Sequence, residues 1–300
     1  MRACKVGLVG ISGFGKRHLK AVESLEKEGI VSLEAVCDIE YEKNRDKIEE
    51  LRGKGVGYYQ DYGDMLGKAG DLDFIVISTP IHLHKRMSID AMKAGLHVLL
   101  EKPPAVTIQD VDEIITASRE TGRFCAVEFT RTSYGTFLEL KKQIREGRLG
   151  RIRYITGVGL WKRLDSYYER TAWAGRLVYR NSYVLDGTVN NPLSHLLNNI
   201  LLLAKAAQPG GQGSASVSSV TAELYHAHDI EAEDTSCVRI ETDNGIALSF
   251  YATLCHGCGE TLASGEIPYI EVEGTDGKAV WRFNDKLKVK CGGSVHKYDG

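Results

Sequence analysis

A lysine that could take part in proton transfer stands at position 102, directly after a short apolar run. The run over 96–100 predicts a strand buried on both faces, and Pro103 and Pro104 predict its end, because proline cannot donate to a central ladder. Ligands of open α/β sheets bind at the carboxyl ends of the strands. We therefore expect Lys102 beside a ligand, where partial desolvation of its ammonium group favours proton transfer.

A glycine-rich turn near position 10 predicts a dinucleotide site, with a tight turn that binds nothing as the alternative. An apolar strand over 5–9 precedes the turn, a helix is expected over 16–28, and a second strand over 32–37 follows. Such glycines let backbone amides approach a pyrophosphate, and an acid about 20 residues further on accepts hydrogen bonds from the ribose. The residues predicted to bind here are Gly10, Ser12, Gly13, Phe14, Gly15 and Asp38.

Two residues of this unit bear on its ligand. Ser12 stands where the pattern has its middle glycine, so it either donates its hydroxyl to a phosphate or crowds the site. The carboxylate of Asp38 repels a 2′-phosphate, and Ile39 and Glu40 supply no arginine to bind one. The sequence therefore favours NAD over NADP.

The alternation of strands and helices continues to about residue 129 and predicts a doubly wound parallel sheet. The elements expected are helices over 41–51, 61–66, 84–94 and 107–121, strands over 73–77, 96–102 and 124–127, and a loop that contains Tyr58 and Tyr59. Thr79 and Pro80 form a further strand-end turn on the ligand edge. His82 and His84 after it either face the cofactor or are polar residues at a helix start.

The remainder, 130–300, is expected to be a second, α+β domain. A half-buried strand over 151–158 precedes a long irregular segment, 161–187, that is rich in aromatic residues and arginines. These side chains, Trp173 and Arg176 among them, suit a polyhydroxyl or carboxylate ligand, with subunit contact as the alternative. Successive strands follow over 217–226, 235–242, 246–254, 267–273, 278–282 and 286–291, which predicts an open, mostly antiparallel sheet.

A helix is expected between these strands. Asn191 is a good N-cap and Pro192 a good first helical residue, so the helix should run to about Ala207, before Pro209. His195 then lies one turn in, as either an acid/base residue or an incidental polar one.

The cysteines, the net charge and the lengths of the apolar runs argue against several classes of protein. The spacing in 255–258, Cys-His-Gly-Cys, suits redox or metal chemistry, but without a visible second ligand pair we expect no metal site. A net charge of −2 argues against binding to nucleic acid or an anionic membrane, and no apolar run is long enough to span a bilayer. Seven scattered cysteines and no signal-peptide pattern predict a cytoplasmic protein with free thiols.

Together, the glycine turn, Thr79-Pro80 with His84, Glu101-Lys102-Pro103 and the distal His195 resemble the Gfo/Idh/MocA oxidoreductase family over nearly the whole chain. The resemblance implies a Rossmann domain and an open-faced α/β domain that commonly mediates oligomers, here a dimer or tetramer. It implies NAD(P)-linked oxidation or reduction of sugars, inositols or related compounds. It also implies that Lys102 is the catalytic and substrate-orienting lysine and that His195 transfers the proton.

The sequence departs from this family in two places. Members often have an aspartate four residues before the distal histidine, where this chain has Asn191, which can hydrogen-bond a hydroxyl but cannot ionise. Members also usually run further than Gly300, so we expect a final strand or helix to be missing here.

The sequence thus predicts an NAD-dependent oxidoreductase that acts on a secondary alcohol of a sugar, inositol or related polyol, at a site where Lys102 and His195 share one cleft. An NAD-binding metabolite sensor and an NADPH-using reductase are the alternatives. The expected catalytic residues are Lys102, His195 and Asn191. The substrate-binding residues are expected to be Lys102, Trp173, Arg176, Asn191 and His195. The further cofactor contacts expected are Thr79, Pro80, His84, Glu101 and Lys102.

Overall fold

The computed structural model of the chain describes residues 2–67, 72–207, 216–256 and 267–300. The chain divides into two compact units, Met1–Glu128 and Phe129–Gly300, and each is described by itself. Pro209 and Cys258, which the sequence analysis singled out, lie outside the described residues.

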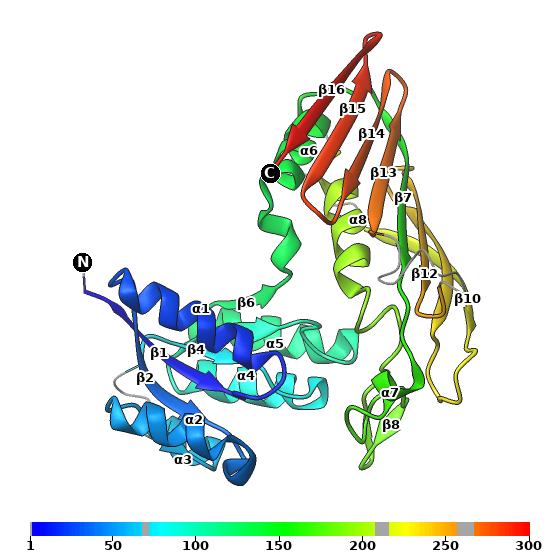
Figure 1. Cartoon of the computed structure of the whole chain (residues 1–300). Helices are drawn as coiled ribbons and strands as arrows, with labels where there is room; N and C mark the ends of the chain where they lie inside the picture. The colour runs from blue at the N-terminus through cyan, green and yellow to red at the C-terminus, as the bar shows by residue number, and fades with distance from the viewer. Residues whose placement is uncertain (1, 68–71, 208–215, 257–266) are drawn as a thin grey trace. The chain divides into compact units, whose positions relative to one another are not determined.

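The first unit is built on a six-stranded parallel sheet (Figure 1). Its order is β3-β2-β1-β4-β5-β6, the order of a dinucleotide-binding fold with its switch point between β1 and β4. The strands are β1 (Cys4–Val9), β2 (Val31–Cys37), β3 (Gly57–Tyr59), β4 (Phe74–Ile77), β5 (His97–Glu101) and β6 (Cys125–Glu128).

Helices cover both faces of this sheet because the four central strands, β2, β1, β4 and β5, bury apolar side chains. One apolar cluster joins Leu19 and Ile48, from α1 and α2, to the strands, and a second joins Met65, Met92 and Ile114, from α3, α4 and α5. The helices are α1 (Gly15–Lys27), α2 (Tyr41–Gly53), α3 (Tyr62–Gly67), η2 (Ile81–Leu83), α4 (His84–Lys93) and α5 (Ile108–Thr121). The predicted doubly wound parallel sheet is confirmed.

One prediction for this unit is wrong. Tyr58 and Tyr59 do not lie in a loop but in the edge strand β3, where they pair in parallel with Val36 and Cys37 of β2. A three-residue strand is too short to show the alternation of side chains by which longer strands are found in a sequence.

The second unit is built on an eight-stranded sheet of order β10-β11-β12-β7-β13-β14-β15-β16. All neighbours are antiparallel except β12 and β7, so the predicted mostly antiparallel sheet is confirmed. The strands are β7 (Ile152–Leu160), β10 (Val217–Tyr225), β11 (Thr235–Thr242), β12 (Ala247–Thr253), β13 (Tyr269–Gly274), β14 (Gly277–Arg282), β15 (Lys286–Cys291) and β16 (Ser294–Asp299). The last of these strands was not predicted.

Helices lie along one face of this sheet and leave the other open (Figure 1). The covering helices are α6 (Gly135–Arg145) and α8 (Ser194–Ala206), with η3 (Thr130–Ser133) before α6. Alternate strand residues such as Phe250 and Trp281 are fully buried under them. The helix α8 approaches β7 closely, because Gly157 and Gly159 present no side chain toward Leu196 and Leu193.

The segment 161–187 is less irregular than expected. It contains the short helix α7 (Asp165–Tyr168) and a hairpin of β8 (Val178–Tyr179) and β9 (Ser182–Tyr183). None of the helices in the described ranges has the length and hydropathy that crossing a membrane requires.

Candidate active site

The glycine turn after β1 is shaped by contacts that only glycine permits. Gly10 has a φ of +82°, and a Cβ there would lie 2.3 Å from the carbonyl oxygen of Ser78 in the loop after β4. A Cβ on Gly15 would lie 2.0 Å from the carbonyl oxygen of Gly10. Gly13 has a φ of +52°, with open space where its Cβ would be. The turn is therefore packed against its neighbours at both ends and open at Gly13, as a cradle for a pyrophosphate must be.

Asp38 is a buried carboxylate that holds the same turn in place. One of its oxygens accepts a hydrogen bond from the amide of Ile11 at 2.9 Å, and the other accepts from the amide of Glu40 at 2.8 Å. Each carboxylate oxygen has a second acceptor site, so two backbone donors leave capacity for ribose hydroxyls. The acid predicted from its distance along the chain is thus in contact with the glycine turn.

Ser12 and Phe14 complete the turn. The hydroxyl of Ser12 exchanges hydrogen bonds with the side-chain amide of Asn44 on α2, at 2.9 and 3.1 Å. The Ser12 side chain is thereby held by a neighbouring helix. Phe14 is half exposed, and the guanidinium of Arg17 lies 4.9 Å from its ring centroid.

A buried histidine joins two strand-end loops of the ligand edge. The ring of His84 lies 2.8 Å from the carbonyl oxygen of Thr79 through Nε2 and 2.8 Å from that of Pro103 through Nδ1. Burial lowers the pKa of His84 below its usual range, despite the hydrogen bonds to these carbonyls. A neutral ring donates to only one of the two carbonyls, so one contact is a hydrogen bond and the other is close packing of the second loop against His84.

The strand end that carries Lys102 is held in place by Glu101. The Glu101 carboxylate is buried, lies 2.7 Å from Nε2 of His18 on α1, and accepts a hydrogen bond from the backbone amide of Lys102 at 3.1 Å. Glu128, its partner on β6, has a pKa raised by burial and by the Glu101 charge. Lys102 itself is half buried, and the Lys102–Pro103 peptide is cis. Glu101 therefore positions the lysine through the backbone.

In the second unit, Asn191 is organised by an acid that the sequence analysis missed. The Asn191 side-chain amide donates to Oδ1 of Asp186 at 2.5 Å. The other oxygen of Asp186 accepts from the amide of Gly175 at 2.8 Å and from Arg170 at 3.0 Å. Asp186 is buried, so a carboxylate lies beside Asn191 although the position itself cannot ionise.

The predicted N-cap role of Asn191 is wrong. The helix α8 begins at Ser194, after hydrogen-bonded turns over 188–193. The Asn191 side chain donates to Asp186. The backbone carbonyl oxygen of Asn191 accepts from the Ser194 hydroxyl at 2.9 Å. His195 therefore lies in the first turn of α8 rather than one turn in. Its ring is buried and packs edge-on against Phe129, with 5.7 Å between centroids.

Trp173 and Arg176 lie in the segment 161–187. The guanidinium of Arg170 lies 5.4 Å from the Trp173 ring centroid, and Arg176 forms an ion pair with Glu231 at 3.4 Å. A cavity of about 540 Å³ opens here, and its polar lining is mainly acidic. Its charged lining residues are Asp165, Glu169, Arg176, Asp229 and Glu231, with His228 beside them. Carboxylates that accept hydrogen bonds suit hydroxyl groups better than an anionic ligand.

The structure thus brings together the turn residues, Asp38, Thr79 and the Lys102 strand end in one unit, and Asn191 and His195 in the other. The residues that hold them, His18 and Asp186, were missed. His18 had a weak signal as a polar residue one turn beyond Gly15, whereas Asp186 lay in a segment without a readable pattern.

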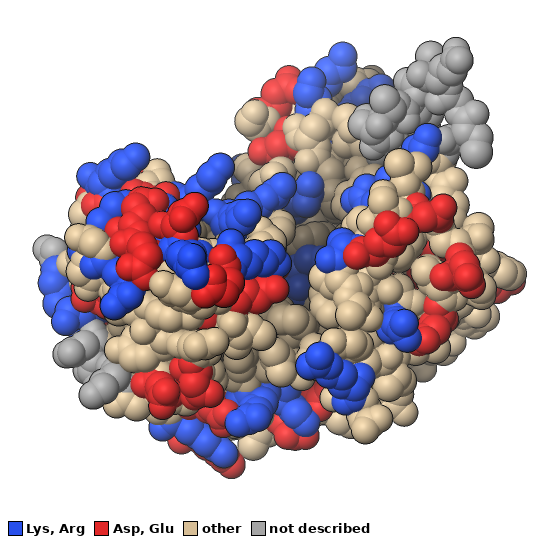
Figure 2. All heavy atoms as spheres, turned by 60° about the horizontal axis from the view of Figure 1, so that its bottom comes forward, with Lys and Arg blue, Asp and Glu red and all other residues tan. Residues whose placement is uncertain are grey.

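Positive and negative side chains are interspersed over the described residues on the face drawn in Figure 2, in keeping with the net charge of −2.

The fold and the glycine turn define an NAD-binding oxidoreductase fold, and comparison with known families agrees. Residues 4–129 match the oxidoreductase family with an NAD-binding Rossmann fold, and residues 137–280 match the Gfo/Idh/MocA C-terminal domain. The chain belongs to the Gfo/Idh/MocA oxidoreductase family. The predicted family and its NAD-binding fold are therefore confirmed.

Two curated relatives show the range of activities nearby. A glycosyl hydrolase family 109 protein of Shewanella pealeana is 28% identical over 160 residues, which cover 51% of this chain and 34% of the relative. A 1-carboxy-3-chloro-3,4-dihydroxycyclohexa-1,5-diene dehydrogenase of Comamonas testosteroni is 27% identical over 241 residues, which cover 80% of this chain and 56% of the relative. The chain thus spans about a third to just over half of their lengths.

A solved structure is similar over most of the chain. The WlbA dehydrogenase of Bordetella pertussis, in complex with NADH and UDP-GlcNAcA, is 27% identical and has a TM-score of 0.77. The match covers 93% of this chain and 78% of that one.

Proposed function

We propose that this protein is an NAD-dependent oxidoreductase that acts on a secondary alcohol of a sugar, inositol or related polyol. The observation that carries the proposal is the strand end Glu101-Lys102-Pro103, held by His18 and His84 on the same sheet edge as the glycine turn. The dehydrogenase relative and the NADH-bound structure support redox chemistry at this edge. The turn residues and Asp38 would hold NAD, which when bound accepts a hydride from the alcohol carbon.

Three side chains of this chain would handle the alcohol. His195 would take the hydroxyl proton, the ammonium of Lys102 would stabilise the developing alkoxide, and Asn191 would hydrogen-bond a hydroxyl of the substrate. In this proposal Asp186 is a positioning residue, because it fixes the amide of Asn191. The proposal requires Lys102 and His195 to reach one cleft.

The substrate class rests on the cavity that Arg176 lines; Trp173 is not among its lining residues. Its acidic lining offers acceptors to several hydroxyl groups, and Arg176 is already paired with Glu231. A polyol or neutral sugar therefore suits it better than a sugar acid, although the similar WlbA structure contains UDP-GlcNAcA.

The test is a reaction panel with a lysine variant. Purified protein is incubated with NAD and a panel of sugars, inositols and sugar acids, and the reduced cofactor is followed by absorbance. Lys102→Ala should lower turnover of the best substrate by roughly 10²-fold or more, because it removes both the charge and the proton-transfer partner. It should leave NADH binding, measured by calorimetry, largely intact.

The matched control is Lys93→Ala, an exposed lysine at the end of α4 in the same unit, which should turn over as the wild type does. A Lys102→Ala enzyme with wild-type turnover would refute the catalytic role. Titration with NADP tests the cofactor: binding clearly tighter than that of NAD would contradict the role given to Asp38.

A second candidate function follows from the first curated relative. A glycosidase of this family would release a sugar from a glycoside without net accumulation of reduced cofactor. Assaying the same panel as nitrophenyl glycosides, with and without NAD, separates the two. Binding of NAD and a sugar without either reaction would instead indicate the sensor that the sequence left open.

We also propose a homo-oligomer, a dimer or tetramer, formed through the open face of the second sheet. The described part of that face and of the edge strand β10 carries exposed apolar side chains, including Tyr154, Tyr251, Val220 and Leu224.

The six cysteines in the described ranges are free thiols, which supports a reducing, cytoplasmic setting.

A further inference from the structure

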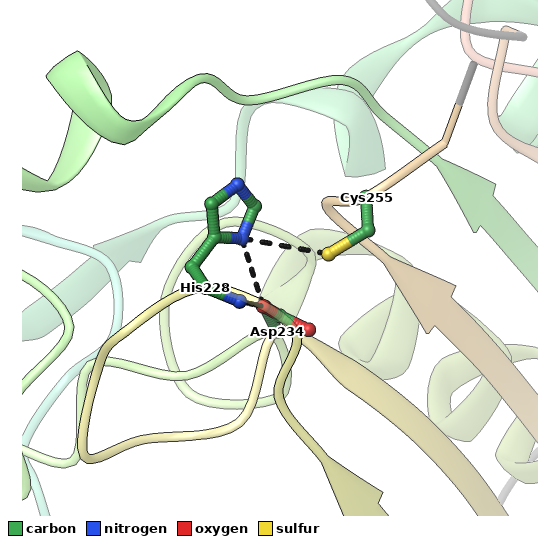
Figure 3. Close-up of side chains that lie close together, drawn as sticks. All are labelled: His228, Asp234 and Cys255. Atoms are coloured by element: carbon green, nitrogen blue, oxygen red, sulfur yellow. Dashed lines mark hydrogen bonds and ion pairs between the residues drawn. The ribbon is translucent and has the colours of Figure 1, made fainter. Parts of the chain in front are cut away.

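Three side chains that could ligate a metal converge in the second unit. His228 follows β10, Asp234 precedes β11, and Cys255 follows β12 (Figure 3). Nδ1 of His228 lies 2.8 Å from Oδ2 of Asp234 and 3.5 Å from Sγ of Cys255. The three ligand atoms all lie within 4.8 Å of one another.

The carboxylate in this cluster is rigidly held. The Asp234 side chain is fully buried, and its Oδ2 accepts hydrogen bonds from the amides of Ala227 and His228, each at 2.9 Å. Its Oδ1 accepts from the hydroxyl of Thr235 at 3.2 Å. A carboxylate fixed by such partners keeps its orientation toward His228 and Cys255, as supporting hydrogen bonds do for metal ligands.

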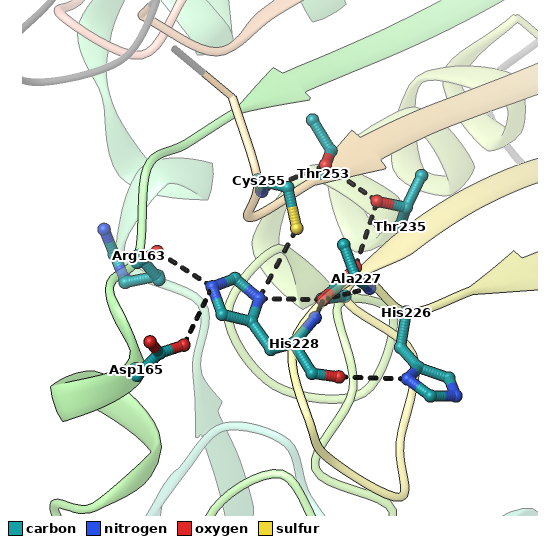
Figure 4. Close-up of polar contacts among 9 residues, drawn as sticks. Arg163, Asp165, His226, Ala227, His228, Thr235, Thr253 and Cys255 are labelled. Atoms are coloured by element: carbon teal, nitrogen blue, oxygen red, sulfur yellow. Dashed lines mark hydrogen bonds and ion pairs between the residues drawn. The ribbon is translucent and has the colours of Figure 1, made fainter. Parts of the chain in front are cut away.

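The orientation of the imidazole is fixed from its other side. Nε2 of His228 lies 3.2 Å from the carbonyl oxygen of Arg163 (Figure 4), which can only accept, so a hydrogen bond here is one that Nε2 donates. The Asp165 carboxylate lies 3.8 Å from the same nitrogen. Metal-ligating histidines commonly donate their second ring N–H to a carbonyl or a carboxylate in this way. Nδ1 lies 2.8 Å from a carboxylate oxygen of Asp234 and also faces Cys255, so it is the nitrogen that would exchange its hydrogen bond to Asp234 for a bond to a cation.

The shared nitrogen also excludes a catalytic triad. In a relay, the nucleophile and the acid contact different nitrogens of the ring. Here the thiol and the carboxylate both approach Nδ1 (Figure 3), and Nε2 is directed to the backbone. Nδ1, the carboxylate and the thiol therefore face one another, as the ligands of a single ion do.

We propose that His228, Asp234 and Cys255 bind a divalent transition-metal ion, with zinc favoured by the nitrogen, oxygen and sulfur donors. Binding would release to solvent the thiol proton of Cys255 and the proton through which Nδ1 of His228 is hydrogen-bonded to Asp234, and the thiolate and carboxylate charges would balance the ion. Three protein ligands with water in the fourth position is a common zinc arrangement. The ion would tie the turn between β10 and β11 to the end of β12, next to the cavity that His228 lines.

The sequence did not indicate this site because its ligands come from separate segments. The spacing noted in the sequence pairs Cys255 with Cys258, which lies outside the described residues, whereas in the fold the neighbours of Cys255 are His228 and Asp234. The competing explanation of the cluster is a doubly protonated His228 that donates to Asp234 with no ion present.

The test uses the untagged full-length chain, purified without chelator. Elemental analysis should find about one zinc per chain. After removal of zinc, added Co²⁺ should produce a thiolate-to-cobalt charge-transfer band in the near ultraviolet. Cys255→Ser and His228→Gln should lose the band and the stoichiometric zinc. Cys237→Ser, which changes a half-buried thiol on the neighbouring strand β11, should keep both.

Wild-type protein provides a readout that does not depend on how the variants fold. X-ray absorption of the zinc-loaded chain should show one sulfur at about 2.3 Å and one imidazole in the first coordination sphere. Protein that neither contains zinc nor develops the cobalt band overturns the proposal in favour of the protonated pair. A band that persists in folded Cys255→Ser, or zinc without a sulfur ligand, overturns it as well.

Discussion

His84 shows how one buried side chain can organise a ligand edge. Its ring lies 2.8 Å from the carbonyl oxygens of both Thr79 and Pro103, so the loops after β4 and β5 both contact a single residue. Asp186 has the same role in the second unit, where it fixes Asn191, Arg170 and the amide of Gly175. In both cases the residue expected to touch the ligand is held by a buried polar group.

The burial of His84 predicts a pH dependence of stability. Burial lowers the pKa of His84 in the folded chain, so as the pH falls below about 6.5 the unfolded chain takes up a proton that the folded chain does not. The free energy of unfolding should therefore decrease from pH 7.5 to pH 5.5. His84→Gln, which cannot take up this proton, should flatten that decrease by about 1 kcal/mol.

Urea unfolding at the two pH values measures this effect. His296→Gln, an exposed histidine on β16, should keep the wild-type pH dependence. Equal slopes for His84→Gln and the wild type would show that the pKa of His84 does not differ between the folded and the unfolded chain, and would contradict the prediction.

At the scale of elements, the position of α8 depends on two glycines of β7. A Cβ on Gly159 would lie 2.7 Å from Cδ2 of Leu193, the fully buried residue before α8. A Cβ on Gly157 would lie 3.0 Å from Cγ of Leu196. Because α8 packs directly on the backbone of β7, the two glycines set how closely the helix approaches the sheet. They therefore also set the position of its first turn, which contains His195.

Gly159→Ala should therefore affect both stability and activity. The added methyl group meets Leu193, which is buried and cannot swing aside, so we expect a loss of roughly 1–3 kcal/mol in the free energy of unfolding. Turnover in the assay above should fall as well, because the start of α8 is displaced. Urea unfolding and steady-state kinetics of the purified variant measure the two effects.

Gly53→Ala is the matched control. Gly53 ends α2, has open space around its Cβ position, and should tolerate alanine with no loss of stability. If Gly159→Ala unfolds like the wild type and turns over normally, β7 and α8 do not depend on this close approach.

At the scale of the whole molecule, the open face of the second sheet carries exposed aromatic side chains that a partner would bury. Tyr154 on β7 is 54% exposed and Tyr251 on the neighbouring strand β12 is 44% exposed, and both lie on the face opposite the helices. Exposed aromatic residues gathered on one face of a sheet are typical of protein interfaces.

Charging this face should dissociate an oligomer that forms there. If the wild type forms the proposed oligomer, its mass in light scattering is a multiple of 33.1 kDa, and the double variant Tyr154→Lys with Tyr251→Lys should elute at the mass of one chain. Ile108→Lys, which charges an exposed apolar residue on α5, should leave the wild-type mass unchanged. A double variant that keeps the wild-type mass would place the interface elsewhere.

The sequence by itself determined the architecture of both units and the cofactor turn. Hydrophobic runs, glycines and prolines act within one element or one turn, so the order of strands and helices and the placement of Gly10, Asp38 and Lys102 at strand ends could be read from it. The cap of α5 is an equally local feature, because the Thr107 hydroxyl accepts from the Asp110 amide, three residues further on, at 3.2 Å. The short strand β3 and the start of α8 could not be predicted from the sequence.

Only the tertiary structure decided which side chains support the candidate site. Asp186 reaches Asn191 across a segment with no periodic pattern, Glu101 reaches His18 between a strand and a helix, and Asp234 brings His228 to Cys255. These contacts join residues whose neighbourhood is created by packing, because hydrogen-bond geometry depends on distance in space and not on spacing along the chain.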